Sequence, residues 1–349
     1  MAEGYGKIYE STWWGDTTNS IYWGSVYANL AGGVVSDIVN SFAARVVADG
    51  GSVESTACLE TDLTYLTENP IVPDFTGLLN DYSGAAAAYS LRLLDNTYSG
   101  NAVRVRRASD NTEQDIGFAN NELDTTSLET FCSGTDGFVA TWYDQSGNAV
   151  NAANATAAEQ PKIVASGSTI LENGKAAVRF DGSNDKLKFS QVITGTTSRS
   201  FFITNKVDIS GAAEFGCLIS LDVASSGSGT SYRISRETAE IRLRVSGSSA
   251  FNYPSGTTAL DYNLLTNIWT NGGSQDAKFW SNSVSAPYST GTSSNLNTSI
   301  TTGFHYMGWS NVGSNTLDGN IQEMVIYASD QSTSRTGIET NINTHYSIY

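Results

Sequence analysis

Hydrophobic and polar residues alternate with a period of two along much of the chain after about residue 100. The alternation is clearest at 103–106, 186–189 and 241–245, where Val, Leu, Ile or Phe alternates with Arg or Lys. Successive side chains of a strand point to opposite faces, so the pattern predicts strands with one solvated face. Turn signals separate the segments, at Asn173-Gly174, Asp181-Gly182, Asn271-Gly272-Gly273 and Asp318-Gly319. Many short strands with these separators indicate an all-β antiparallel sandwich.

Three other segments have the spacing of helices. Apolar residues recur every three to four positions over 34–47, and Gly50-Gly51 would end that helix. The run 85–94 predicts a second, short helix. Apolar residues four apart over 334–346 predict an amphipathic helix that closes the chain.

Composition narrows the functional classes. The chain has 349 residues, 35 acidic against 19 basic, for a net charge of −16, and 40% of its residues are hydrophobic. This hydrophobic content is enough for a core, whereas the acidity argues against a nucleic-acid partner, which selects clustered Lys and Arg. The sequence has no apolar run of about 18 residues, so no membrane insertion is expected. The first residues lack the order of a signal peptide.

The charge is concentrated at the N-terminal end. Residues 1–83 hold eleven acidic residues against Lys7 and Arg45, a net charge of −9. We therefore expect two domains, a mixed and partly helical assembly or anchoring module at 1–83 and a β domain at 84–349. Residues 1–30 are rich in Trp, Tyr and Gly and form an aromatic leader. Exposed aromatic clusters mark interfaces, so we expect this leader to dock on its own domain or on another subunit. The leader residues assigned to assembly are Tyr9, Trp13, Trp14 and Trp23.

Metal and nucleophile chemistry has little support. The cysteines, Cys58, Cys132 and Cys217, are odd in number and far apart, which predicts buried thiols rather than disulfides or a zinc site. The histidines, His305 and His345, form no HExxH motif. We expect no metal and no cofactor.

Two carboxylate clusters remain as candidates for hydrolysis of a glycoside, which needs two acids that flank one bond. One is Asp144 in the segment 142–148, and the other is Asp181 with Asp185. Both read as tight loops after strands, where Asp accepts backbone N–H bonds. Structural turn roles are the favoured interpretation, and catalysis is the alternative.

Sugar binding is the milder functional hypothesis. It needs an aromatic face for the C–H side of a sugar ring and planar polar groups for the hydroxyls. The candidate residues are Trp142, Tyr143, Asp144, Trp309 and Asn311. The competing interpretation of a Trp in a sandwich is a place in the core.

Four blocks of sequence are more specific. Residues 88–94, 102–107, 115–118 and the WYDQSGN segment at 142–148 together resemble the catalytic domain of the arabinofuranosidase B type, glycoside hydrolase family 54. Three later segments resemble concanavalin A-like and laminin-G-like jelly rolls, namely 160–164, 177–182 and 319–327. The resemblance implies a concanavalin A-like jelly roll over 84–349.

The sequence departs from that family's active-site pattern. The family carries adjacent cysteines followed by an acid in its second half, where this chain has the lone Cys217. The family also places an acid near a late glycine-rich turn, where this chain has Ser310 and Asn311. Neither Ser nor Asn is a general acid at neutral pH, so we assign no catalytic residue. An arabinofuranosidase-type hydrolase of surface polysaccharide stays as the alternative.

The N-terminal segments 6–15 and 42–51 resemble structural proteins of tailed phages. This resemblance implies a virion protein, assembled in the host cytoplasm and exposed on the particle as a tail-fibre, spike or head-surface decoration subunit. Its expected partners are other virion proteins, copies of itself in a homo-oligomer, and a host surface glycan. A purely architectural protein without a ligand is a further alternative.

Overall fold

The computed structural model describes residues 75–195, 197–208, 216–221, 232–237, 240–245, 249–254, 263–271, 276–283, 288–289, 303–310 and 315–349. Apart from Phe75, these residues belong to the second of the two units into which the chain divides, Thr76–Tyr349. The predicted helix at 34–47 and the leader residues Tyr9, Trp13, Trp14 and Trp23 lie outside the described residues.

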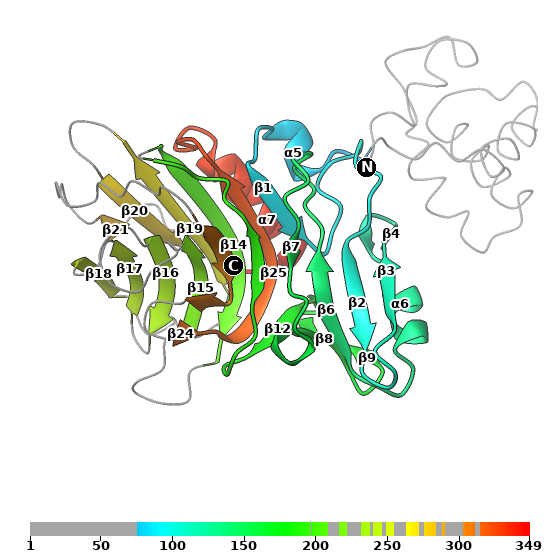
Figure 1. The fold of residues 1–349 in the computed structure, drawn as a ribbon. Coiled ribbons are helices and arrows are strands. Elements are labelled where there is room, and N and C mark those ends of the chain that lie inside the picture. Colours follow the sequence, from blue (N-terminus) through cyan, green and yellow to red (C-terminus); the bar gives the residue numbers. More distant parts are fainter. Residues whose placement is uncertain are drawn as a thin grey trace, which may run out of the picture. The chain divides into compact units, whose positions relative to one another are not determined.

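Strands dominate the described part of the chain (Figure 1). In chain order they are β1 (Ala87–Ser90), β2 (Val103–Arg107), β3 (Glu113–Ile116), β4 (Phe118–Ala119), β5 (Glu122–Leu123), β6 (Gly137–Trp142), β7 (Ala152–Ala153), β8 (Lys162–Ala165), β9 (Ser168–Thr169), β10 (Leu171–Glu172), β11 (Lys175–Ala176), β12 (Val178–Asp181), β13 (Leu187–Ser190), β14 (Arg199–Val207), β15 (Gly216–Leu221), β16 (Tyr232–Glu237), β17 (Glu240–Val245), β18 (Ser249–Pro254), β19 (Asn263–Thr270), β20 (Asp276–Ser281), β21 (Tyr288–Ser289), β22 (Phe304–Met307), β23 (Trp309–Ser310), β24 (Asn315–Thr316) and β25 (Asp318–Tyr327). The helical elements are α5 (Leu78–Asp81), α6 (Thr125–Phe131), the 3₁₀ turn η1 (Ala157–Glu159) and α7 (Arg335–Tyr346). No helix among these is long and apolar enough to cross a membrane.

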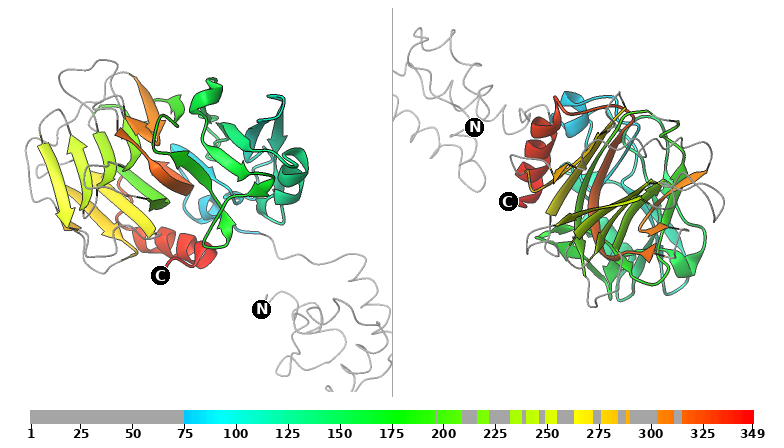
Figure 2. Two further views of the ribbon diagram at one scale, coloured as in Figure 1. Left: turned by 90° about the horizontal axis from the view of Figure 1, so that it is seen from below. Right: turned by 90° about the vertical axis from the view of Figure 1, so that its left-hand side faces the viewer.

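Most of the strands form one large, curled antiparallel sheet, which confirms the all-β, jelly-roll fold class (Figure 2). The strand β25 lies at its centre, because β14 pairs with one edge of β25 while β12 and β1 pair with the other. From β14 the sheet continues through β19 to β20 and β21. A second run of strands leads from β13 through β22 and β15 to β16, β17 and β18.

Two clusters of buried side chains stabilise this arrangement. The larger one fills the inside of the curled sheet and includes Trp142, Phe180, Phe189, Phe201 and Met324. The smaller one lies on the other face of β1, β14 and β25, where α5 and α7 cover the sheet; it includes Leu78, Ala88, Phe202, Val325 and Ile338. The central strands are therefore buried on both faces.

A buried ion pair ties the segment after β1 to β25. The guanidinium of Arg92 makes two contacts with the carboxylate of Glu323, Nε–Oε2 at 2.8 Å and Nη2–Oε1 at 3.0 Å. The hydroxyl of Ser90 donates to the same carboxylate at 2.7 Å, and that of Tyr346 on α7 donates at 3.3 Å. Glu323 has no exposed surface, so its charge depends on these partners.

Several sequence predictions are confirmed and two are wrong. The alternating segments are β2, β13 and β17, and the closing helix is α7. The run 85–94 is not a helix, because its residues 87–90 form β1 and are buried on both sides. Asp318-Gly319 is not a turn but begins β25. The glycine is needed there for close packing, since a Cβ on Gly319 would lie 2.2 Å from the carbonyl oxygen of Lys206 on β14.

Candidate functional site

The pairing of β13 with β22 sets up one outward-facing row of side chains. On β22, His305 and Met307 are buried, whereas Phe304 is exposed and Tyr306 is half-buried. Lys188 of β13 lies directly opposite Tyr306 and is exposed. The alternation of the two strands therefore places Lys188, Phe304 and Tyr306 on the same solvated face.

Trp309 extends this row. It follows β22 after Gly308, and its ring packs edge-on against Tyr306 with the ring centroids 5.0 Å apart. The Nζ of Lys186 lies 5.0 Å from the centroid of the Trp309 ring. The same ammonium pairs with the carboxylate of Glu159 at 2.8 Å, so the charge of Lys186 is balanced.

Lys188 makes the closest contact between a cation and a ring on this face. Its Nζ lies 3.4 Å from the centroid of the Phe304 ring, and 46% of Phe304 is exposed. The quadrupole of the ring attracts a cation placed over its face. We refer to the following set as the aromatic–lysine surface: Lys186, Lys188, Phe304, Tyr306 and Trp309.

The turn between β12 and β13 adjoins this surface. Thr316, which lies opposite Trp309 in the β23–β24 hairpin, donates to the carbonyl oxygen of Gly182 at 2.5 Å. In the same turn the carboxylate of Asp185 accepts the backbone N–H of Asp181 at 2.9 Å. Asp185 is 6% exposed, and burial, together with the charge of Asp181, raises its pKa to about 7. The turn thus holds a carboxyl group that titrates near neutral pH.

Asp144 has a turn role instead. Its carboxylate accepts the backbone N–H groups of Ala88 at 2.8 Å, Ser146 at 2.9 Å and Val150 at 3.0 Å. It therefore joins β1 to its own loop and is 3% exposed. None of these bonds leads to the Asp181 turn, so the two predicted carboxylate clusters serve different loops.

The other predicted sugar contacts do not gather in one place. Trp142 has no exposed surface, and its Nε1 donates to the carbonyl oxygen of Ser90 at 3.3 Å. It therefore offers no face to a sugar and belongs to the core. The hydroxyl of Tyr143 donates to Asp115 on β3 at 2.6 Å. Burial, followed by this bond, raises the pKa of Tyr143 to about 12. Asn311 lies outside the described residues.

The described histidine and cysteine side chains on the nearby strands are structural. The Nε2 of His305 accepts the backbone N–H groups of Val192 at 3.1 Å and Ile193 at 3.3 Å, and burial lowers its pKa to about 3. Cys217 is buried on β15. Within the described ranges, no group of His, Cys, Asp and Glu has the arrangement of a metal site.

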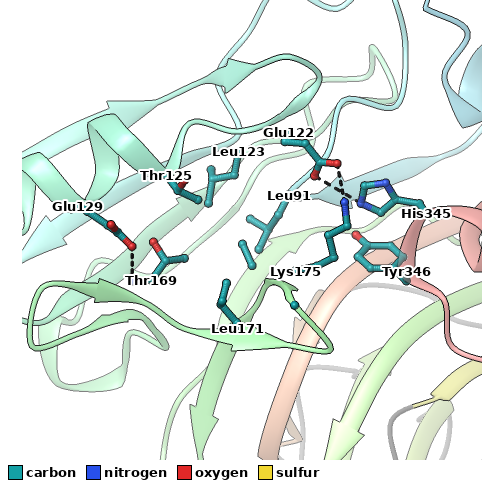
Figure 3. A pocket seen from close by; sticks show the side chains of 12 residues that line it. Leu91, Glu122, Leu123, Thr125, Glu129, Thr169, Leu171, Lys175, His345 and Tyr346 are labelled. Carbon is teal, nitrogen blue, oxygen red and sulfur yellow. Dashed lines mark hydrogen bonds and ion pairs between the residues drawn. The ribbon is translucent and has the colours of Figure 1, made fainter. Parts of the chain in front are cut away.

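A pocket of about 370 Å³ lies elsewhere, between the β4–β5 hairpin, α6, the β10–β11 hairpin and the end of α7 (Figure 3). At one end of it, Glu122 binds the Nζ of Lys175 at 2.8 Å and lies 3.5 Å from the Nε2 of His345. Burial, and next the charge of Arg92, lowers the pKa of His345 to about 4. None of the residues predicted to bind sugar lines this pocket.

The prediction from sequence found one member of the aromatic–lysine surface, Trp309, and missed the members on β13 and β22. The sequence does contain a signal that these residues are exposed. Lys188 lies in a segment recognised as an alternating strand, and Phe304 and Tyr306 alternate with buried neighbours in the same way. What the sequence does not contain is the pairing of two strands more than 100 residues apart.

Comparison with known proteins supports part of the resemblance. The family model of the α-L-arabinofuranosidase B catalytic domain matches residues 81–250, just under half of the chain. The WYDQSGN segment at 142–148 lies inside this match. No curated protein sequence matches the chain.

Solved arabinofuranosidases share the fold. One is a GH54 α-L-arabinofuranosidase soaked with a cyclic sulfate inhibitor, with 16% identity, a TM-score of 0.54, and coverage of 74% of this chain and 62% of that one. Another is an arabinofuranosidase in complex with arabinofuranosyl-α-1,2-xylobiose, with 17% identity, a TM-score of 0.52 and the same coverage of 74% and 62%. The chain therefore spans about three fifths of these proteins, and the likeness establishes a common β fold.

Proposed function

We propose that the chain is a structural protein of a tailed-phage virion, a tail-fibre, spike or head-surface decoration subunit, whose jelly roll binds host surface glycans without hydrolysing them. The aromatic–lysine surface carries the glycan-binding part of this proposal. Aromatic faces pack on the C–H faces of sugar rings, and a few polar groups fix the orientation. Phe304, Tyr306 and Trp309 supply the rings, and Lys188 supplies a polar group beside them.

We infer the absence of hydrolysis from the residues found where the resemblance places the family's active site. Ser310 stands near the late glycine-rich turn, is buried, and accepts the hydroxyl of Ser220 at 3.3 Å. A serine hydroxyl does not donate a proton to a leaving group at neutral pH. Cys217 stands alone where the family has adjacent cysteines. These replacements favour a binding role for the fold.

The virion part of the proposal rests on the N-terminal segments 6–15 and 42–51. In it, the leader holds the chain against copies of itself and other virion proteins, and the jelly roll is exposed on the particle. Many copies in a symmetric array would turn weak glycan contacts into useful avidity. Deletion of residues 1–30 should then yield a monomer that no longer enters particles. Incorporation of the truncated protein would overturn this role of the leader.

A binding measurement tests the glycan part. Trp309→Ala should reduce binding on a glycan array at least tenfold, because the largest ring of the surface is lost. Tyr98→Ala is the matched control, since Tyr98 packs against Phe118 on another part of the domain. Absence of glycan binding by the folded wild-type protein would overturn the proposal in favour of a purely architectural role.

One observation favours the hydrolase alternative. Asp185, whose pKa is raised to about 7, lies beside a second carboxylate, that of Asp181. A carboxyl group with such a pKa suits general acid catalysis. Incubation of the protein with arabinan and capsular polysaccharide decides between the two functions. Reducing sugar released by the wild type and lost in Asp185→Asn or Asp144→Asn, with the fold intact, would establish hydrolysis. We expect none.

A further inference from the structure

Lys188 differs from other lysines of the domain in its partners. Four lysines pair with a carboxylate, as Lys162–Asp136, Lys175–Glu122, Lys186–Glu159 and Lys206–Glu172. Within the described part of the chain, no carboxylate lies within ion-pair distance of Lys188. Its nearest described partner is the Phe304 ring. The aromatic–lysine surface therefore carries one uncompensated positive charge.

This charge is placed where a ligand would meet it. Lys188 is exposed on β13, opposite Tyr306 and beside Phe304, which is 46% exposed. A chain with a net charge of −16 repels anions in general, so a single cation among aromatic rings forms a local exception. A sugar ring stacked on these aromatic side chains would hold its substituents within reach of the ammonium.

From this geometry we propose that the aromatic–lysine surface selects an anionic sugar unit, one that carries a carboxylate or a sulfate, over neutral sugars. This inference rests on the proposed glycan-binding function and narrows it to a class of ligand. The rings supply contact area that any sugar can use, and Lys188 supplies the discrimination. Lys186 adds little to it, because Glu159 balances its charge at 2.8 Å.

At a single copy of the aromatic–lysine surface, we expect only a modest preference for acidic glycans. An exposed ammonium and an anion in water attract each other weakly and are screened by salt. We therefore expect a preference of about two- to fivefold for an acidic over a matched neutral glycan at low salt, decreasing as salt rises. Multiple copies would amplify that preference.

The experiment compares matched polysaccharides with the full chain. De-esterified and fully methyl-esterified homogalacturonan share one backbone and differ in whether each carboxyl group is a charged carboxylate or a neutral methyl ester. Dextran sulfate and dextran likewise share one backbone and differ in the sulfate groups. Affinity electrophoresis or biolayer interferometry at two salt concentrations gives the ratios. If the protein prefers the charged polysaccharide in the homogalacturonan pair alone, the ligand carries a carboxylate. If it does so in the dextran pair alone, the ligand carries a sulfate.

Three variants connect the preference to Lys188. Lys188→Gln should abolish it while binding of the neutral glycan persists, and Lys188→Arg should retain it. Lys206→Gln removes the same charge elsewhere on the domain and should leave the preference unchanged. Equal binding of charged and neutral glycans by the wild type, or an effect of Lys206→Gln as large as that of Lys188→Gln, overturns the inference but leaves glycan binding in place. Absence of binding to every glycan overturns the proposed function itself.

Discussion

The pKa values of two buried carboxylates in this domain are shifted in opposite directions. Burial raises the pKa of Asp185, and the nearby charge of Asp181 adds to the effect. Burial opposes ionisation of Glu323 as well, but the Arg92 guanidinium and the Ser90 hydroxyl outweigh it and hold the pKa of Glu323 below its ordinary value. The environment of each group therefore decides its charge at neutral pH.

The raised pKa of Asp185 predicts a stability that falls as pH rises. Between the ordinary Asp value of about 4 and the folded value of about 7, the folded state binds more protons than the unfolded state. The free energy of unfolding must therefore decrease with pH across this window. Asp185→Asn removes this loss and should raise that free energy at pH 8 by on the order of 2–4 kcal/mol, with little change at pH 4.

Urea unfolding of both proteins from pH 4 to pH 8 measures this effect. Asp81→Asn on α5 provides the control, because Asp81 is an exposed carboxylate. Parallel stability profiles for the wild type and Asp185→Asn would show that Asp185 is not held protonated in the folded state.

For the buried pair of Arg92 and Glu323, we expect removal of one partner to destabilise the domain more than removal of both charges. Arg92→Met leaves the Glu323 carboxylate buried without its cation and should destabilise the domain by about 3–5 kcal/mol. Adding Glu323→Gln removes the uncompensated charge and should recover part of the loss. A double-mutant cycle in urea gives the coupling, and purely additive effects would argue against the ion pair.

At the scale of elements, the sequence predicted best the strands that have one wet face. The segment at 186–189 alternates because one side of β13 is buried and the other is exposed. On β2 the valines are buried, and the opposite side holds the half-buried Arg104 and the buried Arg106. The segment that became β1 has no such alternation, since the smaller core cluster covers its second face. Its alanine-rich run has high helix propensity, which pairing with β25 overrides.

Gly308 controls the element that presents Trp309. Its φ is +80°, and a Cβ there would lie 2.3 Å from two ring carbons of Phe180. Gly308→Ala should therefore combine backbone strain with overpacking and cost about 2–4 kcal/mol. Gly147→Ala separates the two causes, because Gly147 has a φ of +86° with nothing within 4 Å of the added carbon.

Thermal unfolding and glycan binding of both glycine variants provide the readout. Gly308→Ala should lower the melting temperature more than Gly147→Ala does, and it should also weaken binding through Trp309. Equal melting temperatures for the two variants would mean that Phe180 yields to the added carbon.

At the scale of the whole molecule, the second unit has its own core and its own covering helices. Leu78 and Leu79 of α5 belong to the cluster under α7, so the folded unit includes the residues just before 84. A fragment of residues 76–349 should unfold cooperatively, as a single domain does. Calorimetry of the fragment and of the full chain tests this, and a fragment without a cooperative transition would contradict it.

The candidate site illustrates what sequence reasoning can reach at this scale. Trp309 was found because tryptophan is chemically conspicuous, yet the same logic selected Trp142, which the fold buries completely. Lys188 and Phe304 belong to the surface only because β13 pairs with β22. Such long-range pairing follows from the tertiary fold, so local periodicity identifies the strands without showing which of them meet.

The central position of β25 has a consequence for how the protein is made. The ribosome produces β25 after β1, β12 and β14, yet all three of these strands require it as a neighbour. Glu323, the ion-pair partner of Arg92, lies 231 residues further along the chain. These earlier strands therefore leave the ribosome with unpaired edges, which favour aggregation until β25 has been made. The sheet cannot close before β25 is synthesised, and a chain that stops short of β25 leaves three open edges in place of its centre.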